Sequence, residues 1–306
     1  MSANLINLFT TQFSTNLELK LQQQTSMLRG RVTEGSHVGR QASPVQYMNP
    51  IKMQTPAGRF APIGRVDTDF TRRWVFPADK DLPQLVDTFD ELRTLNDPKS
   101  MYPSNASAAV AREWDDILIA AAFATAYTGV GSDNAALTSE TFSTSDYQIA
   151  STFGASAATG LTVPKLVELK RLFRKNHVDL DTEQVTIVAG SQQESDLLNS
   201  AIVTSRDFNE KPVLVDGKVT RFMGFDFVWS ERLATASNVR NVIAFAKSGL
   251  YLGVWKDMTN IISQRNDLTG HPWQIYTMMT AGATRLMPGK VMSILCSDTS
   301  AVDITP

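Results

Sequence analysis

The chain has 306 residues, 42% of them apolar and 20% charged, so it can bury a sizeable core, and wholesale disorder is excluded. A net charge of −2 argues against a nucleic-acid binder that relies on a basic excess. The single cysteine, Cys296, excludes an internal disulfide framework and a thiolate zinc cluster. No apolar stretch reaches the ~20 residues of a membrane-spanning helix and no secretory signal is visible, so we expect a protein made in the cytoplasm.

Residues 1–30 form the first unit and carry apolar side chains at helical spacing. The stripe consists of Leu5, Ile6, Phe9, Phe13 and Leu17. A single helix cannot bury such a stripe alone. The segment therefore either packs on its own domain or reaches another subunit as an arm, and the sequence leaves both interpretations open.

Residues 31–80 predict a long hairpin that leaves the body of the protein. Gly and Pro punctuate the segment, and strands are expected over 45–53 and 64–76 with a turn at 54–58. Eight basic residues oppose three acidic ones from Arg29 to Phe76, whereas nine acidic residues oppose four basic ones from Asp79 to Asp116. Opposite patches favour docking in a defined register. The alternative is that both are ordinary solvated surfaces.

The strongest helix prediction covers residues 105–128, where one face is apolar and nine alanines add helix propensity. Mixed α/β structure is expected from residue 161 onward. A helix should begin after Thr162, with Pro164 in its first turn. Further predicted elements are a strand at 184–188, a short helix at 192–200, a hairpin turn at Asp216-Gly217, strands at 225–229, 242–246, 250–255, 260–264, 275–278 and 291–295.

The search for a catalytic or metal site fails at each candidate. The three histidines are far apart in the sequence, and no metal-binding motif is present. Ser191 sits between a predicted strand and helix, as in a nucleophile elbow, but the second glycine of that motif and a histidine partner are missing. Asp115 and Asp116 cannot face one point, because neighbours on a helix diverge by about 100°. We therefore expect no enzyme activity, no metal and no cofactor.

The order of these elements resembles the major capsid proteins of tailed bacteriophages, which have the HK97-like fold. Residues 111–120 followed by 126–129 look like the spine helix of that family. The run 185–190 into a helix ending at Leu198 looks like the core of the axial domain, as does 217–219 leading to 224–228. Residues 282–286 with 290–291 are similar to the closing strands.

The resemblance implies an α+β fold with five parts. These are an N-terminal arm (1–30), an extended β-hairpin loop (31–80), a peripheral domain with the spine helix at about 105–128 (81–150), an α/β axial domain (151–238), and a return to the peripheral β-sheet (239–306).

The function implied by the resemblance is mechanical. Such a major capsid protein forms hexamers and pentamers that close an icosahedral head shell around phage double-stranded DNA, in a virion assembled in the host cytoplasm. Its expected partners are copies of itself, a separate scaffolding protein, a portal, a cementing protein and non-specifically contacted DNA, with no membrane. An encapsulin-like nanocompartment shell and an α/β enzyme with an unrecognised site are the alternatives.

The charge asymmetry and the arm give the expected contacts between subunits. Basic residues of the hairpin should meet acidic residues of a neighbour, while the arm packs through its apolar stripe. The hairpin residues are Lys52, Arg59, Arg65, Arg72 and Arg73, and the acidic residues are Asp87, Asp90, Glu91, Asp115 and Asp116.

Overall fold

A computed structural model describes residues 22–55, 58–59, 62, 64–86, 102–129, 137–200, 214–215 and 218–299. The chain divides into two compact units. Unit 1 comprises residues 1–25, 79–112 and 256–279, and unit 2 comprises residues 26–78, 113–255 and 280–306. Expected arm residues 5–17 lie outside the described residues.

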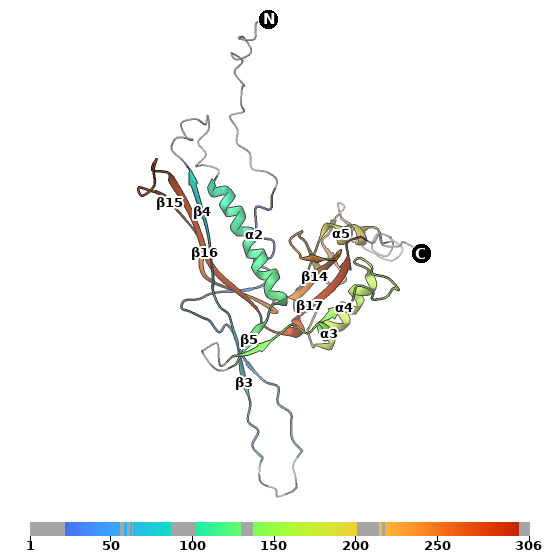
Figure 1. Cartoon of the computed structure of the whole chain (residues 1–306). Helices are drawn as coiled ribbons and strands as arrows, with labels where there is room; N and C mark the ends of the chain where they lie inside the picture. The colour runs from blue at the N-terminus through green and yellow to red at the C-terminus, as the bar shows by residue number, and fades with distance from the viewer. Residues whose placement is uncertain are drawn as a thin grey trace. The chain divides into compact units, whose positions relative to one another are not determined.

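Unit 2 is built on a seven-stranded sheet with the order β11-β12-β8-β14-β17-β7, and β13 pairs with β14 (Figure 1). Strand β8 is parallel to β12 and antiparallel to β14, which in turn is antiparallel to β17. Every residue of β8 is buried, as expected for a strand covered on both faces. The strands are β7 (Gln148–Ile149), β8 (Val185–Ala189), β11 (Arg221–Phe222), β12 (Phe225–Trp229), β13 (Thr235–Ala236), β14 (Val239–Ala246) and β17 (Val291–Ser297).

This sheet corrects the expected domain boundary at residue 238. Strands β14 and β17 lie beyond that residue, yet they share one sheet with β8 and β12. The antiparallel pairing of β14 with β8 joins Ile243 to Val188 and Ala246 to Val185. Residues 239–246 and 291–297 therefore complete the seven-stranded sheet of unit 2.

Helix α4 (Val163–Lys175) confirms the predicted helix after Thr162, with a proline in its first turn. Its leucines and Phe173 are buried in the main core, together with residues of β8 and β17. Helix α5 (Ser191–Leu198) confirms the short helix that follows β8. The remaining short elements are α3 (Thr144–Tyr147), β9 (Leu214–Val215), β10 (Lys218–Val219) and a 3-10 helix (Pro288–Lys290).

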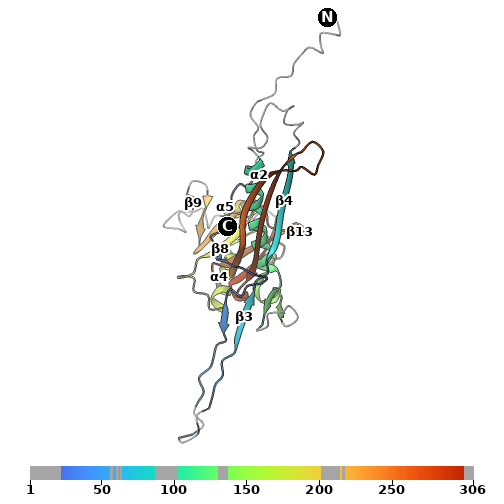
Figure 2. The same ribbon diagram turned by 90° about the vertical axis from the view of Figure 1, so that its left-hand side faces the viewer.

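The predicted hairpin is confirmed, although its paired strands are short. Strand β2 (Gln46–Met48) pairs antiparallel with β3 (Phe70–Trp74), which continues through β5 (Ala126–Thr128) to β6 (Thr138–Glu140). Residues 49–55 and 64–69 between the two strands run away from the sheets of unit 2 in both views (Figures 1 and 2).

A second sheet has the order β1-β15-β16-β4, and its long strands lie side by side in Figure 2. Strand β15 (Leu250–Gln264) joins two predicted strands into one, and β16 is Trp273–Arg285. The sequence prediction missed β1 (Thr33–Ser36) and β4 (Ala78–Val86). Strand β4 is an edge strand, where Pro83 and alternating charges are tolerated because one row of backbone groups needs no partner strand.

Helix α2 (Tyr102–Phe123) corresponds to the predicted helix but ends five residues earlier than expected. The reason is that Tyr127 and Thr128 pair with Trp74 and Arg73 in the sheet, so their backbone groups are used by β5. Most of the predicted apolar stripe is buried: Val110, Trp114, Leu118, Ala121 and Ala122 are less than a tenth exposed, whereas Ile117 is half-buried.

Candidate assembly surfaces

The hairpin, residues 46–74, carries several exposed apolar side chains. These residues lie on both sides of the hairpin, and Met53 is fully exposed. They are Met48, Ile51, Met53, Val66 and Phe70. The sequence prediction emphasised charge and missed this feature, because sparse apolar residues without alternation do not indicate a surface. These side chains make the hairpin a candidate contact surface.

Three of the five predicted basic residues of the hairpin are exposed. Lys52, Arg59 and Arg65 lie on the surface, and the guanidinium of Arg65 forms an exposed ion pair with Asp67 at 2.6 Å. Arg72 is half-buried in β3. The hairpin therefore presents positive charge beside its apolar side chains.

Arg73 is buried, which corrects the expectation that it faces a neighbouring copy. Only 5% of the residue is exposed. Its Nε donates to the carbonyl oxygen of Leu286 at 2.7 Å, and its Nη2 pairs with a carboxylate oxygen of Glu140 at 2.6 Å. Arg73 therefore fastens the base of the hairpin to its own subunit.

Arg285 is a second buried arginine near this base, and the sequence offered no pattern that would reveal it. It is fully buried and donates to the carbonyl oxygens of Ala122 and Ala124, at the end of helix α2. Its guanidinium also lies 5.3 Å from the centre of the Phe142 ring. Burial lowers the pKa of Arg285 and the charge of Arg73 adds to that effect, while Glu140 opposes it.

The acidic half of the predicted contact does not form one surface. Asp115 is fully buried within its own subunit, and the carboxylate of Asp116 binds the guanidinium of Arg232 in a two-point ion pair. The expectation that Asp115 meets a neighbour is therefore wrong, and Asp116 already has a partner in its own chain. Asp87, Asp90 and Glu91 lie outside the described residues.

Gln22 and Gln23 contact helix α2. In unit 1, Arg112 donates to the side-chain oxygen of Gln22 at 2.7 Å and to the carbonyl oxygen of Gln23 at 3.3 Å. The side-chain amide of Gln22 also donates to Asn105 at 3.1 Å. These contacts give Gln22 and Gln23 a role that the sequence did not reveal.

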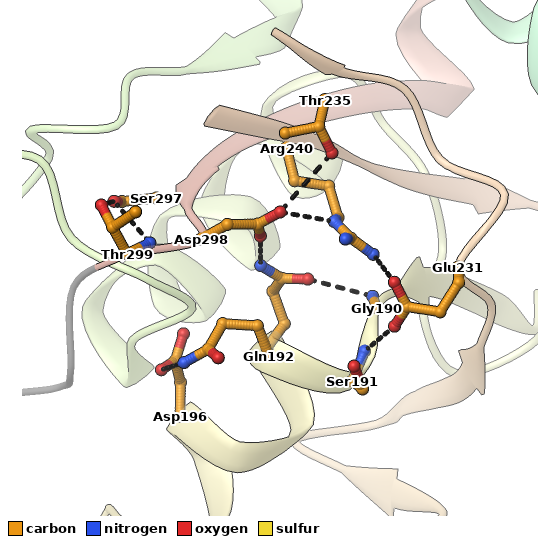
Figure 3. A network of polar contacts seen from close by, with 11 residues as sticks. Gly190, Ser191, Gln192, Asp196, Glu231, Thr235, Arg240, Ser297, Asp298 and Thr299 are labelled. Atoms are coloured by element: carbon orange, nitrogen blue, oxygen red, sulfur yellow. Dashed lines mark hydrogen bonds and ion pairs between the residues drawn. The ribbon is translucent and has the colours of Figure 1, made fainter. Parts of the chain in front are cut away.

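A polar network closes one end of the seven-stranded sheet (Figure 3). Arg240 lies between the carboxylates of Glu231 and Asp298, with 3.0 Å between its Nε and Asp298. The backbone N–H of Ser191 donates to Glu231. Burial alone would raise the pKa of Glu231, but the hydrogen bonds from Ser191 and Arg240 outweigh it and lower the pKa to about 2. The contribution of Ser191 to this network is its backbone N–H.

Lys165 and Cys296 are buried inside unit 2. The ammonium of Lys165 donates to the carbonyl oxygens of Thr159, Gly160 and Leu295 at 2.8–3.0 Å, and burial lowers its pKa. Burial raises the pKa of Cys296 to about 12. Neither side chain is accessible to a substrate.

The described residues hold no group of three or more His, Cys, Asp and Glu side chains placed to bind a metal ion. Across these same ranges, no helix has both the length and the apolar character needed to cross a membrane.

Several phage capsid structures superpose on this chain. The capsid structure of cyanophage P-SCSP1u superposes with a TM-score of 0.73 at 15% identity, covering 97% of this chain and 95% of that one. The cyanophage Pam1 capsid gives 0.73 at 12% identity over 95% and 97% of the two chains, and a structure from Mycobacterium phage Che8 gives 0.68 at 15% over 94% and 97%.

These likenesses establish the fold, which confirms the expected HK97-like α+β architecture. No curated protein sequence matches the chain. The model of the phage capsid protein family matches residues 5–298, which is nearly the whole chain. The chain therefore belongs to the phage capsid protein family and is a major capsid protein, a structural component of the virion.

Proposed function

We propose that copies of this chain assemble into hexamers and pentamers that close an icosahedral head shell around double-stranded DNA. The observation that carries this proposal is the hairpin, which runs away from the sheets of unit 2 and carries exposed apolar side chains. A two-stranded hairpin is marginally stable alone in water. A neighbouring copy that covers the hairpin would bury this surface at each contact in the shell.

The hairpin docks on the acidic segment of a neighbouring copy. Lys52, Arg59 and Arg65 remain available for this contact, because they are exposed. Their proposed partners are Asp87, Asp90 and Glu91 in the acidic stretch of the sequence. Exposed ion pairs contribute roughly 0 to 1 kcal/mol each. Their role in this contact is therefore to set its register. The apolar side chains supply most of its affinity.

The assembly includes further partners in this proposal. A separate scaffolding protein guides the copies in the host cytoplasm, a portal occupies one vertex, and a cementing protein covers the outer surface. The packaged DNA is contacted non-specifically. The net charge of −2 supports this last point, because a protein that condensed DNA by itself would need a large basic excess.

Electron microscopy of the purified chain tests the proposal. The chain is expressed alone and together with a phage scaffolding protein, and negatively stained samples are compared. We expect capsomers or closed shells in at least one of the two preparations. A compact monomer in both preparations, at concentrations where other capsid proteins assemble, would contradict the assembly role.

A further inference from the structure

The turn at residues 26–30, called the arm root here, closes around the carboxylate of Asp115 in helix α2. The hydroxyl of Ser26 donates to Oδ1 of Asp115 at 2.5 Å. The backbone N–H of Met27 donates to Oδ2 at 3.0 Å and that of Leu28 to Oδ1 at 3.1 Å. Since the acceptor is charged and Asp115 is fully buried, these hydrogen bonds are of the stronger kind.

The arm root is also closed on itself. The hydroxyl oxygen of Ser26 accepts from the backbone N–H of Arg29 at 3.1 Å. The backbone N–H of Gly30 donates to Glu34 at 2.8 Å, and its φ of +88° is a conformation that favours glycine. The backbone N–H groups of Arg29 and Gly30 and the φ angle of Gly30 therefore stabilise the shape of this turn.

Apolar and aromatic contacts add to these hydrogen bonds. Leu28 is 2% exposed, and the guanidinium of Arg29 lies 4.7 Å from the ring centre of Trp114, the residue before Asp115. None of these residues belongs to the main core of unit 2 around β8, α4 and β17. Loosening the arm root should therefore leave that core intact.

We infer that Asp115 is a positioning residue, which holds the arm root on helix α2 and so fixes the point from which the N-terminal arm starts. The residues on the N-terminal side of the root are the part that meets a second copy of the chain. This inference rests on the proposed assembly function. It also explains why a charged side chain is buried in α2: Ser26, Met27 and Leu28 of the arm root donate to its carboxylate.

The first test is amide hydrogen exchange of the unassembled full-length chain. Asp115→Asn keeps the size of the side chain but removes the charge and turns an NH₂ group toward N–H donors. We expect exchange of the Met27 and Leu28 amides to become at least about tenfold faster, while amides of β14 and β17 stay unchanged. Asp116→Asn is the matched control, and it should leave both root amides protected. Unchanged protection in Asp115→Asn would overturn the anchoring role.

The second test compares shell formation by the same variants. Asp115→Asn should give no more than about a tenth of the regular shells of the unchanged chain, and Ser26→Ala, which removes one of three donors, should be intermediate. Faster exchange with normal shells would overturn the positioning role, because a merely structural turn would behave in that way. If even the unchanged chain forms no shells, the proposed function fails, whereas the exchange result still supports or overturns anchoring by Asp115.

Discussion

Asp115 and Asp116 are adjacent in helix α2 but hold different parts of the subunit. Asp115 accepts the backbone N–H of Leu28 at the arm root, whereas Asp116 binds Arg232 in the loop that follows β12. The two side chains diverge because successive helical residues are rotated by about 100°. One turn of the helix therefore fixes both the start of the arm and a loop of the seven-stranded sheet.

The base of the hairpin should depend on Arg73 for stability. Arg73→Ala removes a hydrogen bond to Leu286 and the ion pair with Glu140. We expect the free energy of unfolding to fall by about 2–3 kcal/mol, because hydrogen bonds to charged groups contribute more than neutral ones. Arg65→Ala, at an exposed residue of the same hairpin, should change it by less than about 0.5 kcal/mol. Urea unfolding measures both, and equal effects would show that Arg73 is not the fastening point.

Apolar and basic residues of the hairpin should contribute to assembly in different ways. Replacing Met48, Ile51 and Met53 by serine should weaken assembly at all salt concentrations. Reversing Lys52, Arg59 and Arg65 to glutamate should weaken it most at low salt, because the Debye length falls from about 10 Å at 0.1 M to about 3 Å at 1 M. Sedimentation reports the assembly state and circular dichroism the fold.

A matched control for these two variants reverses the exposed charges of Arg174 and Lys175 at the end of α4. That double variant should form shells like the unchanged chain.

Protease should also cut the hairpin quickly in free subunits and slowly in shells. Normal shells from both hairpin variants, or equal cleavage in the two states, would contradict the proposed contact.

The thiol of Cys296 should be unreactive in the folded chain. It is fully buried in β17, and burial raises its pKa to about 12, so the reactive thiolate is scarce at pH 8. We expect maleimide labelling at least about a hundredfold slower than in denaturant. Met53→Cys, which adds an exposed thiol, should label at once. Rapid labelling of the unchanged chain with its circular dichroism intact would show that β17 opens.

The stability contributed by Glu231 should depend on pH. Its pKa falls from 4.5 to about 2 in the folded chain, so the carboxylate stabilises the fold above pH 4.5 and loses that effect as the pH falls toward 2. Glu231→Gln should lower the free energy of unfolding at pH 7 by less than about 1 kcal/mol, since the side chain is more than half exposed. Urea unfolding at pH 7, 4 and 2.5 should show this difference shrinking, and a constant difference would contradict it.

The sequence predicts the local elements well because their patterns are short-range. The apolar face of α4, the stripe of α2 and strand β12 all follow from residues within a few positions of each other. The sequence prediction missed strand β4 because its charges and Pro83 suit an edge strand, which lacks the apolar pattern of a buried strand.

Buried charges account for most of what the sequence could not predict. Counting charges treats every arginine and aspartate as exposed, yet Arg73 and Asp115 are buried by partners 213 and 87 residues away in the chain. Lys165 likewise contacts Leu295 across 130 residues. Only the tertiary fold brings such groups together, so the charge asymmetry overestimated how many of these side chains are available to a neighbour.

The fully exposed side chain of Met53 also affects the chemical ageing of unassembled protein. Peroxide converts a methionine thioether to a sulfoxide, which is polar and chiral. Met48 and Met53 lie in water in the free subunit, so they should oxidise before the buried Met279 and Met292. A stored stock of free subunits should therefore lose its ability to assemble while it keeps its fold. Reduction of the sulfoxides by methionine sulfoxide reductases should restore that ability.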